Sequence, residues 1–159
     1  MPLSDILHNR VIKMEVRSRR KAHAVEELVD LLIEAGDLPM SLRTHALQIV
    51  AEREKIIGTG MNHGVAIPHG STDRIDSIIG ALGISREGVD FESSDGEPAR
   101  IIMLLLIPRR SFQEHLRAMA ATAKLMRQEQ VRNDIINADT PGGVLEIIEK
   151  AEAEDEEKR

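Results

Sequence analysis

The chain has 159 residues, of which 42% are hydrophobic and 30% charged, a length and balance typical of one globular domain. Its net charge of −6 and its two aromatic residues, Phe91 and Phe112, argue against binding to nucleic acid through phosphates or stacked bases. The lack of cysteine excludes disulfides, thiolate catalysis and cysteine-bound zinc. No apolar run is long enough for a membrane span or a signal peptide, so we expect a cytoplasmic protein without membrane insertion.

The first third of the chain predicts one strand followed by two helices. Residues 11–16 alternate loosely and predict a strand. Ser18 is the candidate N-cap of a helix over about 19–35, and Gly36 supplies the stop at its C-terminus. A second helix is expected to open near Pro39 and to run to about residue 54.

The next motif is an apolar run that leads into a proline, a histidine and a glycine. Residues 65–67 predict a short buried strand, and Pro68 ends it because proline has no N–H to donate. His69 is therefore expected at a rigid strand end, where its side chain can be aimed. Gly70 lacks a Cβ atom, so we expect another backbone or a partner protein to approach the imidazole closely. An ordinary surface histidine after a turn remains the alternative.

Two further strands are expected in the second half. Residues 78–84 predict a strand that ends in a turn over 85–88. Residues 101–107 are apolar without interruption, which is typical of a central strand buried on both faces, and Pro108 ends the run.

The C-terminal third predicts helices. Ser111 opens a capping box for a long helix that breaks near Gln128, and Thr140 followed by Pro141 starts a last helix that runs to about residue 151. We therefore predict a single α/β domain over residues 1–151, a mixed sheet with helices on both faces, and a solvated charged tail over 152–159.

One arginine interrupts an apolar helix face. Arg53 continues the stripe formed by Leu42, Ala46, Ile49 and Val50. A guanidinium that faces a core is costly unless it is paired, so an internal ion pair or a side chain that reaches out to water is one interpretation. The other is an anion site, because the planar fork of arginine suits phosphate oxygens.

A histidine lies at the edge of another apolar face. His115 falls in the first turn of the helix that follows Ser111, where a neutral imidazole and a nearby anion are favoured. Alone it would be read as a structural histidine, but with His69 and Arg53 it suggests a pair of histidines facing an anion. The residues expected to be buried on this helix are Phe112, Leu116, Met119, Ala123 and Met126.

The other histidines give weaker signals. His8, His23 and His45 are read as surface residues. A metal site, with a hydrolase activity, is a competing hypothesis, but its ligands match no compact metal-binding motif, so we expect no metal and no cofactor. Its candidate ligands are His63, His69, Asp73 and His115.

Taken together, these motifs resemble the IIA domain of the phosphoenolpyruvate-dependent sugar phosphotransferase system (PTS), type 2. This is the fructose/mannitol class, which includes stand-alone nitrogen-regulatory IIA proteins. The resemblance covers about residues 3–151. It rests on Arg53-Glu54-Lys55, Thr59-Gly60, Gly64-Val65-Ala66-Ile67-Pro68-His69-Gly70, Gly88-Val89-Asp90-Phe91, Asp95-Gly96-Glu97-Pro98 and Glu114-His115-Leu116.

The resemblance implies a function and a fold. His69 matches the histidine that is phosphorylated, His115 the second histidine and Arg53 the arginine of the active site. The implied donor is a phosphohistidine carrier protein (HPr-like), and the implied acceptor is a IIB domain in sugar transport or regulatory targets in nitrogen regulation. The implied fold is a mixed β-sheet covered by helices on both faces. The alternative is a non-catalytic regulatory or binding module of the same fold.

Overall fold

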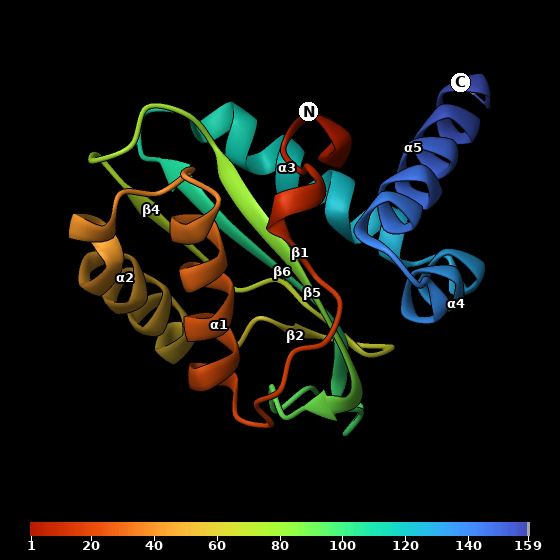
Figure 1. Ribbon diagram of the computed structural model, residues 1–159, viewed down its shortest axis with the longest axis horizontal. Helices are drawn as coiled ribbons and strands as arrows, with labels where there is room; N and C mark the ends of the chain where they lie inside the picture. Colours follow the sequence, from red (N-terminus) through yellow and green to blue (C-terminus); the bar gives the residue numbers. More distant parts are fainter. Residues whose placement is uncertain (159) are drawn as a thin grey trace.

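The computed structural model describes residues 1–158, without the side chain of Phe112. Within this part of the chain, five α-helices and a six-stranded sheet form one α/β domain, as predicted (Figure 1). The strands are β1 (Ile12–Lys13), β2 (Gly60–Met61), β3 (Val65–Ala66), β4 (His69–Thr72), β5 (Ile79–Val89) and β6 (Ala99–Pro108). The helices are α1 (Lys21–Glu34), α2 (Arg43–Ile56), α3 (Phe112–Met126), α4 (Glu129–Asn137) and α5 (Pro141–Glu157). The short 3₁₀ helices are η1 (Leu3–Asp5), η2 (Asn9–Val11) and η3 (Met40–Leu42).

The sheet is mixed, and β6 lies at its centre. The strand order is β1-β5-β6-β3-β2, and β4 also pairs with β6. Strand β5 runs antiparallel to β6, whereas β3 and β4 both run parallel to it. Strands β3 and β4 therefore follow one another along the same neighbour, and the site of interest lies where one gives way to the other.

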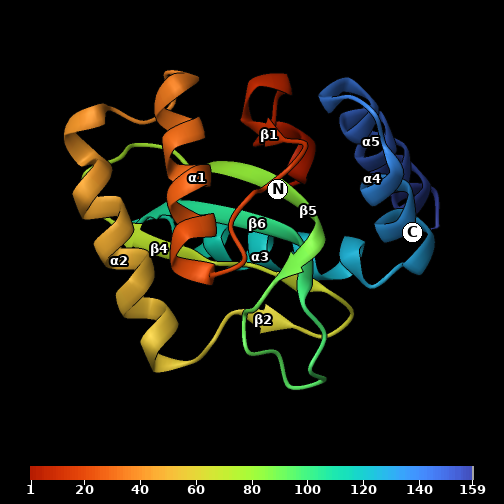
Figure 2. The same ribbon diagram turned by 60° about the horizontal axis from the view of Figure 1, so that its bottom comes forward.

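The helices form layers on both faces of the sheet, as predicted. Helix α1 packs on β5 and helix α2 on β4, and these two helices also contact each other. Helices α3 and α4 contact β6 from the other face, and α5 packs on α4 (Figures 1 and 2). This arrangement places α2 and α3 on opposite sides of β4 and β6.

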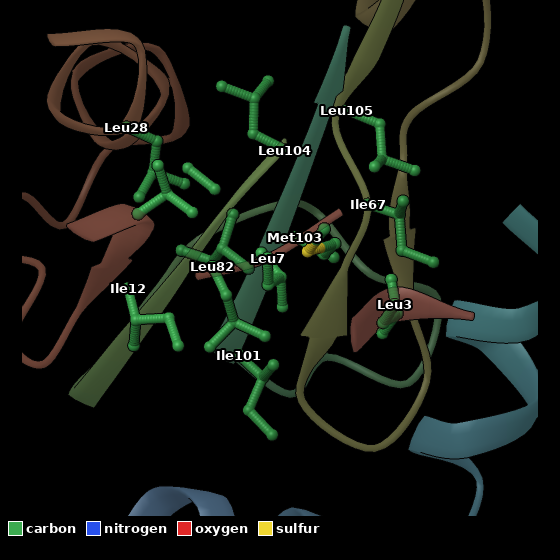
Figure 3. Close-up of a cluster of buried hydrophobic side chains, with 14 of the residues drawn as sticks. Leu3, Leu7, Ile12, Leu28, Ile67, Leu82, Ile101, Met103, Leu104 and Leu105 are labelled. Atoms are coloured by element: carbon green, nitrogen blue, oxygen red, sulfur yellow. The ribbon is translucent and has the colours of Figure 1, made fainter. Parts of the chain in front are cut away.

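The core follows the central strand. Met103, Leu104 and Leu105 of β6 are completely buried, which confirms the predicted two-sided burial of this strand. Their side chains belong to a cluster with Leu28 of α1 and Leu3 of η1 (Figure 3). A core of this size holds the sheet rigid, because apolar burial is the main stabilising term in a domain.

The start of α1 differs from the prediction. The helix begins at Lys21 with Arg20 as its N-cap residue, so Ser18 does not cap it. The carboxylate of Glu27 instead reaches back and accepts hydrogen bonds from the backbone N–H groups of Arg17 (3.1 Å) and Ser18 (2.9 Å). The predicted C-terminal stop is confirmed, since Gly36 has φ +82°, a left-handed conformation that glycine adopts without strain.

The predicted turn over residues 85–88 is wrong. Strand β5 continues through this segment to Val89, and its pairing with β6 shifts between Ile84 and Val89. The buried hydroxyl of Ser85 accepts a hydrogen bond from the N–H of Gly88 at 3.0 Å. This bond closes an irregularity within the strand, of the kind that bends a strand without ending it.

The C-terminal helices begin and break where predicted, but one predicted cap does not form and the last helix is longer. Helix α3 ends before Gln128, and Thr140 caps α5 by accepting a hydrogen bond from the N–H of Gly143 at 3.0 Å. Ser111 occupies the N-cap position of α3, but its side chain makes no capping bond.

Helix α5 does not end near residue 151 but runs on to Glu157. Its charged end is held in two places: Glu152 accepts a hydrogen bond from the N–H of Leu3 at 2.7 Å, and Asp155 pairs with Lys124 at 2.9 Å. These contacts extend the helix into the segment that was predicted to be a solvated tail.

Candidate active site

His69 begins strand β4 rather than ending strand β3. Strand β3 stops at Ala66, and the chain resumes its pairing with β6 at His69, which lies opposite Leu105 in the register. Pro68 fills the interruption, where no ladder N–H is needed, and its carbonyl accepts a hydrogen bond from the N–H of Leu105 at 3.0 Å. The central strand β6 thus fixes the backbone at Pro68 and along the strand that begins at His69.

The imidazole of His69 has one nitrogen engaged. Its Nδ1 lies 2.9 Å from the carbonyl oxygen of Ile67. Because a carbonyl can only accept, Nδ1 carries the proton in this bond, and Nε2 of the neutral ring keeps its lone pair. Only 5% of the residue is exposed, so the ring is held by its surroundings and presents a small part of its surface.

Strand alternation places the second histidine beside the first. Thr72 faces α2, since its hydroxyl lies 2.7 Å from Nε2 of His45 on that helix. His69 is three residues earlier in the strand and therefore points to the opposite face, where α3 packs. His115, in the first turn of α3, meets it there, with ring centroids 5.4 Å apart and ring planes at 81°.

Arg53 lies in the last turn of α2 and is half-buried. Its Nη1 donates a hydrogen bond to the carbonyl oxygen of Ile57 at 2.9 Å, beyond the end of the helix. Among residues 1–158, no carboxylate lies within ion-pair distance of the guanidinium, so the internal ion pair is not found. It is close enough to both imidazoles for its positive charge to lower the pKa of His69 and of His115.

Both imidazoles are biased toward the neutral form. Burial is the main cause that lowers the pKa of His69, and the charge of Arg53 lowers it further, whereas the bond to Ile67 and the charge of Glu54 oppose the shift. Burial also lowers the pKa of His115, followed by the effects of His69 and Arg53. A neutral His69 near pH 7 is a nucleophile with an available lone pair.

We expect this bias to make the protein less stable in acid. In the unfolded chain, His69 is protonated near its ordinary pKa of about 6.5, whereas in the folded chain it is protonated only at lower pH. Between these two pKa values the unfolded state binds more protons, so the free energy of unfolding falls as the pH drops. Denaturant unfolding at about pH 7.5 and about pH 5.5 should show a larger loss for the wild type than for His69→Gln. Equal losses in the two proteins would contradict the lowered pKa.

Two residues near His69 serve the packing of α2 rather than the approach of a partner. Gly70 is buried, and a Cβ atom on it would lie 2.7 Å from Cγ1 of Ile49. Of the two approaches expected at Gly70, by another backbone or by a partner protein, the structure shows the first, since the same Cβ atom would also lie 3.3 Å from the backbone carbonyl carbon of Ile49. His45, predicted to be a surface residue, is half-buried through its contact with Thr72.

The metal hypothesis gains no support from the geometry. The N–H of His63 binds the carboxylate of Asp95 at 2.9 Å, and Asp73 pairs with Arg109 at 3.2 Å. Among residues 1–158, no group of three or more His, Asp or Glu side chains is arranged to hold a metal ion.

Exposed apolar side chains adjoin the site residues in the sequence. Ile56 (76% exposed) and Ile57 (67%) follow Arg53 at the end of α2, and Leu116 (49%) follows His115 on α3. The predicted burial of Leu116 is wrong, that of Met126 is confirmed, and Met119 and Ala123 are half-buried. Three other residues of the helix are buried as well: Ala118, Thr122 and Leu125. The predicted burial of Phe112 lies outside the described side chains. The sequence did not distinguish these exposed side chains from core residues, because an apolar side chain can point either toward the core or toward solvent.

The sequence matches the family model described as "Phosphoenolpyruvate-dependent sugar phosphotransferase system, EIIA 2" over residues 5–151. The chain belongs to this family. A fructose-specific EIIA component from Haloferax volcanii is 31% identical over 146 residues, which are 92% of this chain and 94% of that protein. The fructose-specific EIIABC component of Bacillus subtilis is 30% identical over 148 residues, and the chain spans 23% of that longer protein.

Solved structures of other EIIA proteins share the fold. The nitrogen regulatory protein IIA-Ntr from Neisseria meningitidis is 29% identical and superposes with a TM-score of 0.82, over 92% of this chain and 98% of that one. The IIA mannitol component in a complex with phosphorylated IIB from Escherichia coli has a TM-score of 0.76 at 20% identity, over 91% and 97% of the two chains. This EIIA chain is thus a PTS component with a phosphocarrier or regulatory role. Within residues 1–158, no helix combines the length and the apolar character that crossing a membrane requires.

Proposed function

We propose that this EIIA protein accepts a phosphoryl group on Nε2 of His69 from the phosphohistidine of an HPr-like carrier protein. The observation that carries the proposal is the bond from Nδ1 to the carbonyl of Ile67, which leaves Nε2 as the nitrogen with a lone pair. A bond forms between Nε2 and phosphorus while the bond from phosphorus to the donor nitrogen breaks on the opposite side. The donor ring, protonated on its other nitrogen, takes the electron pair of the broken bond and leaves as a neutral imidazole. The proton of His69 stays on Nδ1, so the phosphorylated ring is an imidazolium and no proton is transferred in this step.

Two neighbouring side chains stabilise the transferred group. We assign to His115 a hydrogen bond to a phosphoryl oxygen and to Arg53 the neutralisation of charge from the side, because both lie within electrostatic reach of His69. The first turn of α3 adds the partial positive charge of a helix N-terminus. Donor and acceptor are both imidazoles, so the protein mainly has to position the groups and compensate charge.

The partner docks on the apolar residues that adjoin the site, Ile56, Ile57 and Leu116. Large exposed apolar side chains are typical of protein interfaces. The next acceptor is a IIB domain or a regulatory target. The complex of the E. coli mannitol IIA with phosphorylated IIB supports the first, and the nitrogen-regulatory relative supports the second.

The test is incubation with phosphoenolpyruvate, the first enzyme of the system and the carrier. Intact mass should show the addition of one acid-labile phosphoryl group per chain. An unchanged mass, with the carrier itself phosphorylated, would support the non-catalytic binding module instead.

Arg53→Ala should slow phosphoryl uptake by about 10²-fold, the usual cost of losing one electrostatic stabiliser of a transition state. It should also raise the pKa of both imidazoles, because the nearby positive charge is removed. Rapid-quench uptake assays and histidine NMR titrations measure the two effects. Arg43→Ala is the matched control, since Arg43 lies at the other end of α2 and pairs with Asp30. If Arg53→Ala behaves like Arg43→Ala, Arg53 has no part in the transfer.

A further inference from the structure

Glu54 follows Arg53 on α2, but its carboxylate is directed at the next segment of the chain. One oxygen, Oε2, accepts a hydrogen bond from the N–H of Thr59 at 2.6 Å, and the other, Oε1, accepts from the hydroxyl of the same residue. Both oxygens are therefore used on one residue, which itself is only 8% exposed. Charge-assisted bonds of this kind are among the stronger hydrogen bonds in proteins.

Thr59 in turn holds the segment that carries the acceptor of the His69 proton. The carbonyl oxygen of Thr59 accepts a hydrogen bond from the N–H of Ile67 at 3.1 Å. The carbonyl of Ile67 is the group that accepts the proton from Nδ1 of His69. Successive hydrogen bonds, joined by the backbone of Thr59 and of Ile67, thus connect Glu54 to His69.

The segment is held from its other side as well. A Cβ atom on Gly60 would lie 2.9 Å from the carbonyl oxygen of Phe91 and 2.5 Å from the hydroxyl oxygen of Ser93. The backbone after Thr59 is therefore packed against residues 91–93, and Glu54 secures it from the side of α2.

We propose that Glu54 is a positioning residue that, through Thr59 and Ile67, keeps the proton of His69 on Nδ1 and so keeps Nε2 available. The role in catalysis rests on the proposed function, but the state of the unphosphorylated ring does not. Glu54 does not touch the phosphoryl group. It acts by holding the carbonyl of Ile67 at a distance of 2.9 Å from Nδ1.

Glutamine separates this role from a simple effect of charge. In Glu54→Gln, the amide oxygen can still accept from the N–H of Thr59, and the amide N–H₂ can donate to its hydroxyl, which then acts as the acceptor. The geometry is kept and the charge is lost. In Glu54→Ala, both are lost.

The measurement is the tautomer ratio of His69 in the unphosphorylated protein, read from its ¹⁵N NMR shifts, together with the rate of phosphoryl uptake. Glu54→Ala should move the His69 proton partly to Nε2 and slow uptake by about 10-fold. Glu54→Gln should stay within about 2-fold of the wild type with an unchanged tautomer ratio. Glu52→Ala is the matched control, since Glu52 is exposed on the same helix and its carboxylate accepts a hydrogen bond from the side-chain amide of Gln48 at 3.2 Å.

Two results would overturn the proposal: a wild-type tautomer ratio in Glu54→Ala, or a Glu54→Gln protein as impaired as Glu54→Ala, which would assign the effect to charge.

If Glu54→Ala does not fold, Thr59→Val and Thr59→Ser replace it. Val removes the hydroxyl and should shift the tautomer in the same direction, whereas Ser should not. Wild-type tautomers in both Thr59 variants would again contradict the proposal. A tautomer shift in a protein whose wild type takes up no phosphoryl group would support the positioning role and overturn the proposed function.

Discussion

Replacing His69 with alanine is expected to abolish phosphoryl uptake from the phosphorylated carrier. The variant lacks the ring whose Nε2 is left with a lone pair by the bond from Nδ1 to Ile67. His115 lies next to it, with ring centroids 5.4 Å apart, but we assign it the stabilisation of the phosphoryl oxygens. His115→Ala should therefore still be labelled, about 10²-fold more slowly.

Intact mass after timed incubation with the carrier distinguishes the two variants. His69→Ala should keep its unmodified mass at all times, while His115→Ala should reach one phosphoryl group per chain after longer incubation. Full labelling of His69→Ala would remove His69 as the acceptor. A labelled His69→Ala beside an unlabelled His115→Ala would reverse the two roles.

Leu105→Ala should cost about 2–5 kcal/mol of the free energy of unfolding, the usual range for a leucine truncated in a core. Leu105 is completely buried on β6, and it faces His69 across the strand pair. Domains are stable by only about 5–15 kcal/mol, so this single change removes a large part of the total. Urea unfolding monitored by circular dichroism measures the loss.

Leu116→Ala is the matched control, because Leu116 is the same residue type and is 49% exposed. Its free energy of unfolding should stay within about 0.5 kcal/mol of the wild type, as is usual for surface changes. Its KM for the phosphorylated carrier should rise, since the residue adjoins His115 on the proposed docking surface. A destabilisation equal to that of Leu105→Ala would contradict the placement of Leu116 at the surface.

The parts of the fold that the sequence predicted are those with a strong local cause. The uninterrupted apolar run in β6 can only be buried on two faces, and Gly36 ends α1 because it adopts a left-handed conformation. The pair formed by His69 and His115 was also anticipated, through the motifs around each residue. In all these cases the information lies within a few neighbouring positions.

The parts that the sequence missed depend on contacts between distant residues. Ser18 has the right type for an N-cap, but Glu27 takes its N–H and the helix starts later. For Gly70 the sequence left open whether another backbone or a partner protein approaches, and only the fold shows that Ile49 of α2 packs there. In the extension of α5, Asp155 pairs with Lys124 of α3, a contact that no local pattern reveals.

The same reason explains what was missing from the candidate site. Only the interruption between β3 and β4 shows that the carbonyl of Ile67 sets the tautomer of His69. Glu54 was named only as part of the motif Arg53-Glu54-Lys55, because the path from its carboxylate to His69 passes through backbone groups that have no side-chain signature.

The most direct measurement is long-range ¹H–¹⁵N NMR of the phosphorylated protein, labelled with ¹⁵N in its histidines. We expect phosphorus to be coupled to Nε2 of residue 69 and the proton to remain on Nδ1. Phosphorus on Nδ1 of residue 69, or on either nitrogen of residue 115, would contradict it.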